Sequence, residues 1–159
     1  MNKIEIKLEK RPDTRHYLDN EQLKRFENKF MHFADIIIDG NSLYQEFKQY
    51  DFISTLGWGT EEFQNEVIMR LMLSIPPQID SKRYEIYVCP LCADLGCGAI
   101  TIDIKKDNST VIWKDFGLEY SYKDEIKIID LGPFVFDLHE YKNVLMSSLG
   151  LAGYKCPWD

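Results

Sequence analysis

Several stretches of the chain alternate hydrophobic and polar residues with a period of two. Residues 4–9 read Ile-Glu-Ile-Lys-Leu-Glu, which predicts a strand with one buried face. Residues 99–106 and 110–116 continue this kind of pattern on either side of Asp107-Asn108-Ser109. Because those three residues are typical of turns, the arrangement predicts a β-hairpin.

Shorter apolar segments predict the remaining strands. An apolar run at residues 33–38 ends at Asp39-Gly40-Asn41, whose residue types indicate a turn. We expect further short strands at residues 84–89, 126–129 and 134–136.

Hydrophobic residues at helical spacing predict two longer helices and a short one. Thr60 is the expected N-cap of the first, which ends near residue 74 before Pro76-Pro77. Residues 137–140 have the spacing of a capping box for a final helix that Gly150 closes. The apolar faces of these helices carry Phe63, Val67, Ile68, Leu71 and Met72 in the first, and Leu138, Tyr141, Leu145 and Leu149 in the second. A short helix is expected around Leu43, Tyr44 and Phe47.

These elements predict an α+β fold for a single domain that spans residues 1–159. Antiparallel hairpins bounded by separate helices are typical of this class. We expect one meandering, mostly antiparallel sheet with two or three helices packed on one face. Residues 10–29 are highly charged and contain Pro12, so we expect a charged loop or partial helix there, with a helical turn near 21–30. Residues 150–159 are expected to form a C-terminal tail.

Acidic residues are concentrated after residue 30. The formal net charge is −7, and residues 1–30 carry eight Lys or Arg against six Asp or Glu, whereas residues 31–159 carry eleven against twenty. Such a surface repels nucleic acid, because phosphate binding depends on basic side chains that displace counterions. It attracts a basic partner and speeds the association. The charge therefore favours a basic protein partner, although an acidic surface also serves solubility alone.

The sequence predicts a cytoplasmic protein without a membrane-spanning segment. The first residues alternate apolar and charged side chains and lack the apolar core of a secretory signal. No stretch approaches the roughly 18 apolar residues of a membrane helix. Four cysteines, three of them within nine residues, do not form a disulfide framework for a chain of this length, so reduced thiols are expected.

The most unusual composition lies at residues 87–99, Tyr-Val-Cys-Pro-Leu-Cys-Ala-Asp-Leu-Gly-Cys-Gly-Ala. Cys89 and Cys92 have the spacing of a zinc knuckle, and Cys97 and Cys156 complete four thiolates in that hypothesis. Redox chemistry would need the first pair at the start of a helix, but the following residues indicate a turn into a strand. A structural turn is the favoured interpretation, since glycine supplies unusual backbone angles and cysteine packs as a small hydrophobe. No metal or cofactor is therefore assigned.

No known catalytic motif is present in the sequence. It contains no nucleophile elbow, phosphate-binding loop, dinucleotide-binding glycine pattern or zinc-protease helix motif. The three histidines are dispersed, and His139 is expected on the solvated face of the final helix. Cys97 and a distant histidine would form a nucleophile pair only if the fold brought them together. We therefore expect a protein that is not an enzyme, with an enzyme of unrecognised type as an alternative.

A partner-binding surface is predicted after the hairpin, where acidic and aromatic residues are interleaved. Carboxylates can take the place of nucleic acid phosphates on the cationic groove of a nuclease. Aromatic residues among charge pairs are typical anchors of a tight interface. For each carboxylate the alternative is a solvated loop charge. The predicted contact residues are Asp115, Phe116, Glu119, Tyr120, Tyr122, Asp124 and Glu125.

Three segments, in order, resemble a bacterial family of small proteins whose function is uncharacterised. They are Cys89-Pro-Leu-Cys-Ala-Asp-Leu-Gly-Cys-Gly-Ala99, Trp113-Lys-Asp-Phe-Gly117 and Leu131-Gly-Pro-Phe-Val-Phe-Asp137. In that family the cysteine turn precedes a strand and a W-x-D-F-G-like segment, and a G-P-F-x-F-D segment leads into a final helix. The resemblance covers about residues 31–148. It implies this order of elements and no active site.

In size and composition the chain is also similar to immunity proteins of bacterial toxin–immunity systems, including contact-dependent growth inhibition. This second resemblance implies a protein that binds and neutralises a cognate toxin with a basic surface, such as a nuclease-like toxin domain. The resemblance is one of type and not of motif. The alternatives are a small protein with a structural zinc site, an unrecognised enzyme, and a self-associating structural or regulatory protein.

Overall fold

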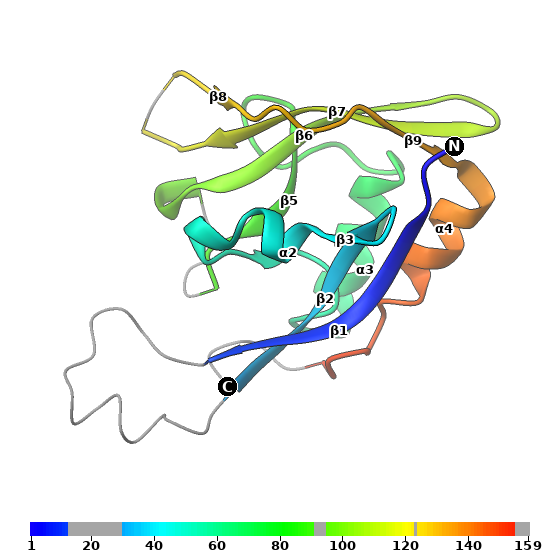
Figure 1. Cartoon of the computed structure of the whole chain (residues 1–159), viewed down its shortest axis with the longest axis horizontal. Helices are drawn as coiled ribbons and strands as arrows, with labels where there is room; N and C mark the ends of the chain where they lie inside the picture. The colour runs from blue at the N-terminus through cyan, green and yellow to red at the C-terminus, as the bar shows by residue number, and fades with distance from the viewer. Residues whose placement is uncertain (13–29, 91–94, 123, 155–159) are drawn as a thin grey trace.

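Two antiparallel sheets and three α-helices account for most of the regular structure of the described residues (Figure 1). The structure is a computed structural model that describes residues 1–12, 30–90, 95–122 and 124–154. The predicted α+β class is confirmed, and the strand pairings of the described residues are antiparallel. The strands form two sheets, however, and not the single meandering sheet that we expected.

The first sheet is a long hairpin with one short additional strand. β1 (Ile4–Pro12) pairs with β2 (Phe30–Ile38) along its whole length, and β3 (Asn41–Ser42) pairs with the end of β2. The turn between β2 and β3 occurs at the predicted signal, where Asp39 and Gly40 both have a positive φ. The alternating pattern at the start of the chain therefore forms a strand, as predicted.

The expected loop at residues 10–29 is wrong at its start, and the helical turn expected near 21–30 is wrong at Phe30. Residues 10–12 belong to β1, and Phe30 begins β2. Arg11 fits inside the strand because it is paired: its Nε and Nη2 donate to the two carboxylate oxygens of Asp51 at 2.9 and 2.5 Å. Residues 13–29, which include most of the predicted helical turn, lie outside the described residues.

The second sheet has six strands and contains the predicted hairpin. Its order is β4–β5–β6–β7–β8, and β9 pairs with the first part of β7. In the hairpin turn, the Asp107 carboxylate accepts hydrogen bonds from Ser109 N at 2.8 Å and Thr110 N at 2.7 Å. These bonds hold the pKa of Asp107 below its usual value. The strands are β4 (Ile53–Ser54), β5 (Tyr84–Val88), β6 (Ala99–Lys106), β7 (Thr110–Glu119), β8 (Lys127–Ile128) and β9 (Phe134–Asp137).

The helices begin at the predicted caps. Thr60 Oγ1 accepts from Phe63 N at 3.2 Å, and Asp137 Oδ2 accepts from Glu140 N at 2.9 Å. The first of these helices ends at Leu71 and not near residue 74, because Leu73 adopts φ of 60° and turns the chain. None of the described helices has the length and apolar character needed to cross a membrane. The helices are α2 (Leu43–Glu46), α3 (Glu61–Leu71) and α4 (Leu138–Met146), with 3-10 turns η1 (Lys48–Tyr50) and η2 (Leu95–Cys97).

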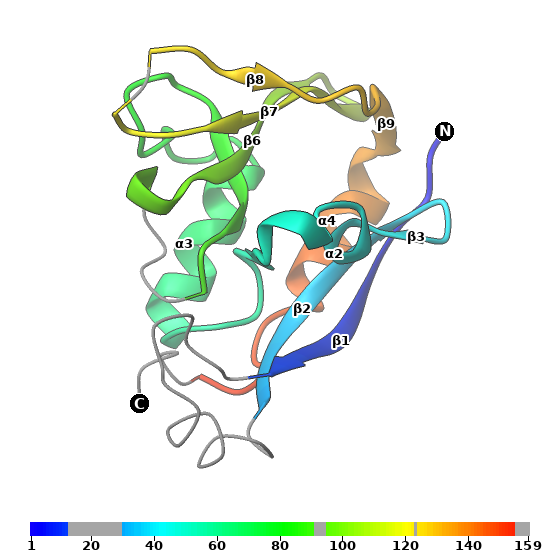
Figure 2. The same cartoon turned by 60° about the vertical axis from the view of Figure 1, so that its left-hand side comes forward.

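The final helix joins the two sheets. α4 contacts β1 of the first sheet and both β7 and β9 of the second, whereas α2 lies against β2 and β3 (Figure 2). The core between these elements is strongly aromatic. Trp113 of β7 is fully buried, and its ring meets the rings of Phe136 and Tyr141 at 5.5 and 6.0 Å between centroids. Residues from both sheets and from α4 therefore belong to one core.

Candidate functional site

A β-bulge in β7 decides which residues of the predicted surface are exposed. The register of β6 against β7 shifts by one residue between Thr101 and Asp103, so β7 contains one extra residue here. Asp115 is the bulged residue: its φ is 54°, and it is exposed. The extra residue reverses the alternation of inward and outward side chains. Trp113 and Phe116 therefore both face the core.

Because of this bulge, the prediction that Phe116 contacts a partner is wrong. The Phe116 side chain is fully buried, and its ring centroid lies 6.5 Å from that of Trp113 and 5.7 Å from that of Phe134. A side chain in this position is part of the core and is not accessible to a partner. Glu119, at the end of β7, is only 7% exposed, so it can contribute little direct contact.

Arg83 connects the bulge to Glu119. Its Nε donates to Thr101 Oγ1 at 2.9 Å, and its Nη2 donates to Thr101 O at 2.9 Å and to the backbone oxygen of Asp115. Thr101 Oγ1 donates in turn to Glu119 Oε1 at 3.0 Å, and Arg83 Nε lies 3.7 Å from the same oxygen. Arg83 therefore satisfies the backbone of the bulge and offsets the charge of Glu119.

Beside this network the surface is hollowed. The hollow has a volume of about 500 Å³ and lies between residues 78–81, which precede β5, and residues 119–126, at the end of β7 and beyond. Three of its lining residues are carboxylates, and none of those that the structure describes is basic. We call it the acidic hollow. It is lined by Gln78, Ile79, Asp80, Ser81, Glu119, Tyr120, Ser121, Asp124 and Ile126.

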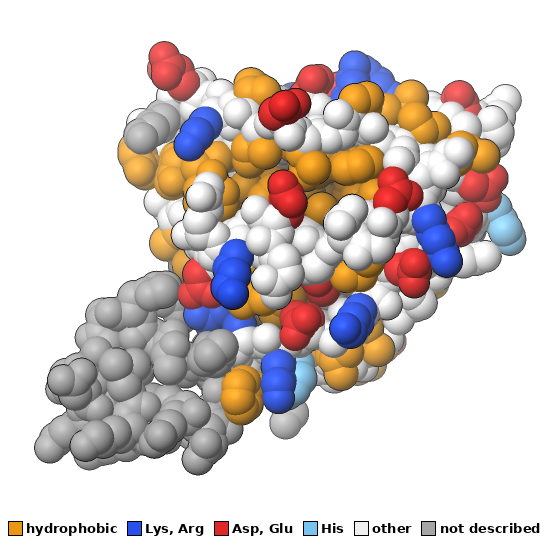
Figure 3. Space-filling view, viewed as in Figure 1, with side chains coloured by type: hydrophobic (Ala, Val, Ile, Leu, Met, Phe, Trp, Pro, Cys, Tyr) orange, Lys and Arg blue, Asp and Glu red, His pale blue; other side chains and the backbone are white. Residues whose placement is uncertain are grey.

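Two tyrosines give the acidic hollow an aromatic edge. Tyr120 lines it and is half-buried, while Tyr122 is 67% exposed. Their ring centroids are 5.3 Å apart with an interplanar angle of 44°. Figure 3 shows carboxylates and hydrophobic side chains next to one another along the edge of the molecule that carries β7 and β8. Such a mixture offers both charge and apolar contact area.

The structure brings together only part of the predicted contact set. Glu119, Tyr120 and Asp124 line the acidic hollow. Tyr122 lies beside it, because its ring packs against the ring of Tyr120. Asp115 and Glu125 are exposed but are not among the lining residues. Sequence reasoning missed Asp80, because nothing in the loop after the two prolines indicates that it folds beside the end of β7.

The turn that contains the cysteines supports this surface. Gly98 has φ of 90°, and a Cβ atom at this position would lie 2.7 Å from Cε1 of Tyr120. Only glycine leaves room for the Tyr120 ring here, which supports the structural interpretation of the turn. Cys89 is buried and Cys97 is exposed.

The zinc hypothesis depends on residues beyond those described. Two of its four cysteines, Cys92 and Cys156, lie outside the described residues, so the four-thiolate site stays a prediction. In the part of the chain that the structure does describe, no group of three or more His, Cys, Asp or Glu side chains could hold a metal ion. His32 and His139 are exposed on β2 and α4, and neither lines the acidic hollow.

A second polar cluster is buried around Asp35 of β2. Asp35 is 1% exposed; its Oδ1 accepts from Tyr87 Oη at 2.6 Å and Tyr44 N at 3.1 Å, and its Oδ2 accepts from Ser42 Oγ at 2.5 Å. Burial raises the pKa of Asp35, and the hydrogen bonds oppose this rise. Burial also raises the pKa of Tyr87 well above its usual value. Because its partners belong to the protein itself, we assign this cluster a structural role.

Comparisons with models of known protein families, with curated protein sequences and with solved structures give no match. The resemblance to the bacterial family with the cysteine turn therefore stays a prediction. The function of the acidic hollow has to be inferred from its own residues.

Proposed function

We propose that this protein is an immunity-type inhibitor that binds a cognate bacterial toxin and neutralises it by covering a basic surface. The acidic hollow carries this proposal, because its described lining holds three carboxylates and no basic side chain. An arginine or lysine side chain of the toxin would pair there with Asp80 and Asp124, which are both exposed. Arg83 already offsets Glu119, so we assign the pairing with a basic toxin side chain to Asp80 and Asp124.

The two tyrosines, Tyr120 and Tyr122, provide the aromatic contact area that the carboxylates of the acidic hollow cannot provide. Charge pairs at the rim of an interface mainly set the association rate and the choice of partner, whereas buried aromatic anchors carry most of the affinity. Tyr122 is exposed and rests against Tyr120, so a partner that covers Tyr122 buries aromatic surface beside the paired charges. We infer that Tyr122 is the anchor and that Asp80 and Asp124 orient the basic partner around it.

The net charge of −7 suits a cationic partner in general. Toxin domains that cleave nucleic acid need a basic groove to hold phosphates, and an acidic protein seated on that groove excludes the substrate. The inhibitor would act in the cytoplasm, where such a toxin finds its substrate. No catalytic step by this chain is required.

The direct test combines growth protection with measured binding. The protein encoded immediately upstream is expressed with and without this chain, and the association rate of the two purified proteins is followed at low and at physiological salt. The upstream protein should arrest growth, and this chain should restore it. An upstream product that is harmless, or that does not bind this chain, would overturn the proposal.

A charge-matched pair of variants tests the acidic hollow itself. Asp80→Lys/Asp124→Lys should slow association about tenfold or more at low salt and abolish protection, because like charges then face the toxin. Glu5→Lys/Glu140→Lys changes the net charge by the same amount at exposed positions on β1 and α4. This control should bind within about twofold of the parent. Equal losses in both variants would show that the acidic hollow is not the binding site.

A further inference from the structure

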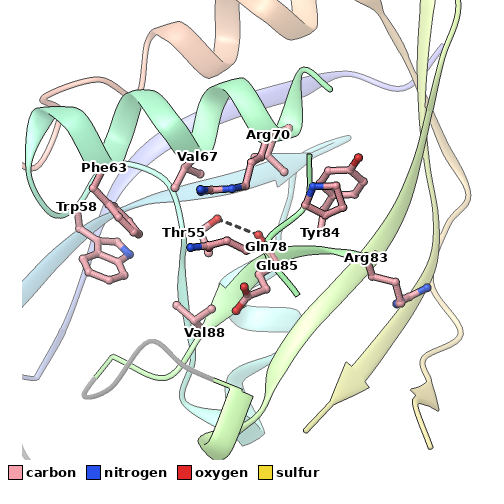
Figure 4. Close-up of a pocket in the computed structure, with 12 residues that line it drawn as sticks. Thr55, Trp58, Phe63, Val67, Arg70, Gln78, Arg83, Tyr84, Glu85 and Val88 are labelled. Atoms are coloured by element: carbon pink, nitrogen blue, oxygen red, sulfur yellow. Dashed lines mark hydrogen bonds between the residues drawn. The ribbon is translucent and has the colours of Figure 1, made fainter. Parts of the chain in front are cut away.

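A second cavity lies between α3 and β5, with a volume of about 130 Å³ (Figure 4). Trp58, Phe63, Val67 and Val88 form one end of this cavity, and Arg70 and Gln78 lie between them and Tyr84 on the other side. We call it the α3–β5 pocket. Gln78, which is exposed, also borders the acidic hollow, but the α3–β5 pocket has a different chemical character.

Arg70 is one of two arginines, with Arg11, that have a buried side-chain nitrogen without a hydrogen-bond partner among the described residues. Among the described residues its guanidinium makes one ion pair, from Nη2 to Glu66 Oε2 at 3.5 Å, while Nε is buried and has no hydrogen-bond partner. The Arg70 side chain is only 17% exposed. A guanidinium carries five N–H donors, and buried donors without acceptors cost free energy. The pocket therefore presents a cation that an anionic ligand would satisfy.

The apolar end of the α3–β5 pocket is held in place before any ligand arrives. The indole of Trp58 donates through Nε1 to Ser54 O at 2.7 Å, and its ring packs against Phe63 with 5.1 Å between centroids. Val67 of α3 and Val88 of β5 line the pocket beside these rings. A rigid wall of this kind binds an apolar group without first being ordered.

The volume limits the size of the ligand. The pocket's volume is close to the roughly 150 Å³ of a cavity that accommodates benzene, so the α3–β5 pocket limits the apolar part of a ligand to one aromatic ring or a short branched chain. Glu85 of β5 also lines the pocket, and Figure 4 shows its carboxylate on the side away from α3 and Arg70. A ligand anion is therefore favoured beside Arg70 and not beside Glu85.

We propose that the α3–β5 pocket binds a small monocarboxylic acid with an aromatic ring or a branched aliphatic chain. The carboxylate pairs with the Arg70 guanidinium, and the apolar body lies against Trp58, Phe63, Val67 and Val88. This site is independent of the proposed toxin binding. Each proposal is tested without the other, so the failure of one is distinguishable from the failure of the other.

Benzoate is a suitable probe, with benzyl alcohol as its neutral analogue. In a titration followed by ¹H–¹⁵N NMR, benzoate should cause saturable shifts at the Trp58 indole N–H and at Val67 and Val88, with a Kd of about 1 mM or lower. Benzyl alcohol should bind more weakly. The absence of saturable shifts up to about 20 mM benzoate, or shifts confined to another part of the molecule, would overturn the proposal.

Variants at three lining or neighbouring positions make the test specific. Arg70→Gln should weaken benzoate binding about tenfold or more while leaving benzyl alcohol unchanged. Glu66→Gln removes the exposed partner of Arg70 but keeps the guanidinium, so it should bind benzoate at least as tightly as the parent. Val67→Phe fills the pocket and should abolish binding of both probes, which keeps the proposal testable if the Arg70 variant does not fold. Unchanged benzoate affinity in a folded Arg70→Gln or Val67→Phe variant would contradict the proposal.

Discussion

At the scale of single residues, Asp35 has the most demanding environment of the described carboxylates. It is buried on β2 and accepts three hydrogen bonds, from Tyr87, Tyr44 and Ser42. Those bonds favour the ionised form, but desolvation is the larger effect and the pKa is raised. In the folded state Asp35 therefore holds its proton to a higher pH than in the unfolded chain.

This pKa shift predicts a pH dependence of stability. Between the ordinary value of 3.8 and the raised pKa, the folded state binds more protons than the unfolded state, so the free energy of unfolding falls as the pH rises through this window. Asp35→Asn should remove that fall. The amide oxygen can still accept from Tyr87 and Tyr44, and the amide nitrogen can donate to Ser42. Urea unfolding at a series of pH values, with and without the substitution, measures the difference.

Asp39 provides a contrast of opposite sign. It is exposed, and hydrogen bonds from Lys3 N and Asn2 Nδ2 lower its pKa. Its contribution to stability is present above 3.8 and is lost as the pH falls through the lowered pKa. Asp39→Asn should therefore alter only the acid end of the pH profile. A fall in stability between 3.8 and neutral pH that persists in Asp35→Asn would show that another group is responsible.

At the scale of elements, local sequence signals predicted strand and helix starts better than strand register. The turn at Asp107 and the caps Thr60 and Asp137 depend on residues within three positions of one another, so the sequence contains the whole interaction. The bulge at Asp115 is different. It depends on Arg83, which reaches the backbone from a distant segment, so the interleaved acidic and aromatic residues wrongly indicated that Phe116 lies at the surface.

The loop before α3 is packed so closely on β2 that it requires glycine. Gly57 has φ of 78°, and a Cβ atom there would lie 2.5 Å from Cβ of Ala34, which is fully buried. Gly40 has a similar φ of 82° but open space around the same position. Comparing the same substitution at the two glycines therefore separates the cost of the backbone conformation from the cost of close packing.

Gly57→Ala should destabilise the protein more than Gly40→Ala. Both variants incur the left-handed backbone penalty of about 1–2 kcal/mol, and overpacking against β2 adds about 1–3 kcal/mol for Gly57→Ala. Chemical denaturation of the three proteins measures the difference in the free energy of unfolding. Equal losses in the two variants would mean that β2 and this loop move apart easily.

At the scale of the whole molecule, one chain of hydrogen bonds links three elements through the core. Trp113 Nε1 of β7 donates to Tyr141 Oη of α4 at 3.1 Å, and Tyr141 Oη donates to Leu71 O, at the end of α3, at 2.6 Å. Trp113 and Tyr141 are fully buried. The Tyr141 hydroxyl thus satisfies both a buried indole and a carbonyl at the end of a helix.

Tyr141→Phe should cost about 1–3 kcal/mol of stability, because two buried polar groups lose their partner while the ring is kept. The loss should appear as a lower denaturation midpoint with an unchanged slope, since the core stays packed. Tyr154→Phe removes a hydroxyl from a side chain that is 47% exposed, and it should change stability by less than about 0.5 kcal/mol. A Tyr141→Phe variant as stable as this control would show that water replaces the lost partner.

The candidate site was predicted only in part. Tyr120, Tyr122 and Asp124 lie within one short stretch of sequence, so their composition was enough to indicate a surface. Asp80 and Arg83 join that surface from the segment before β5. No spacing rule connects that segment to the end of β7, and only the pairing of β5, β6 and β7 brings the two together.

By itself the sequence determined the α+β class, the hairpin at residues 107–109, the helix caps and the acidic character of the chain. Each of these depends on residues close together along the chain or on composition alone. Only the tertiary structure decided the division into two sheets, the burial of Phe116, the acidic hollow and the α3–β5 pocket. These depend on contacts between distant segments, where packing and hydrogen bonding select one arrangement from several that the local pattern allows.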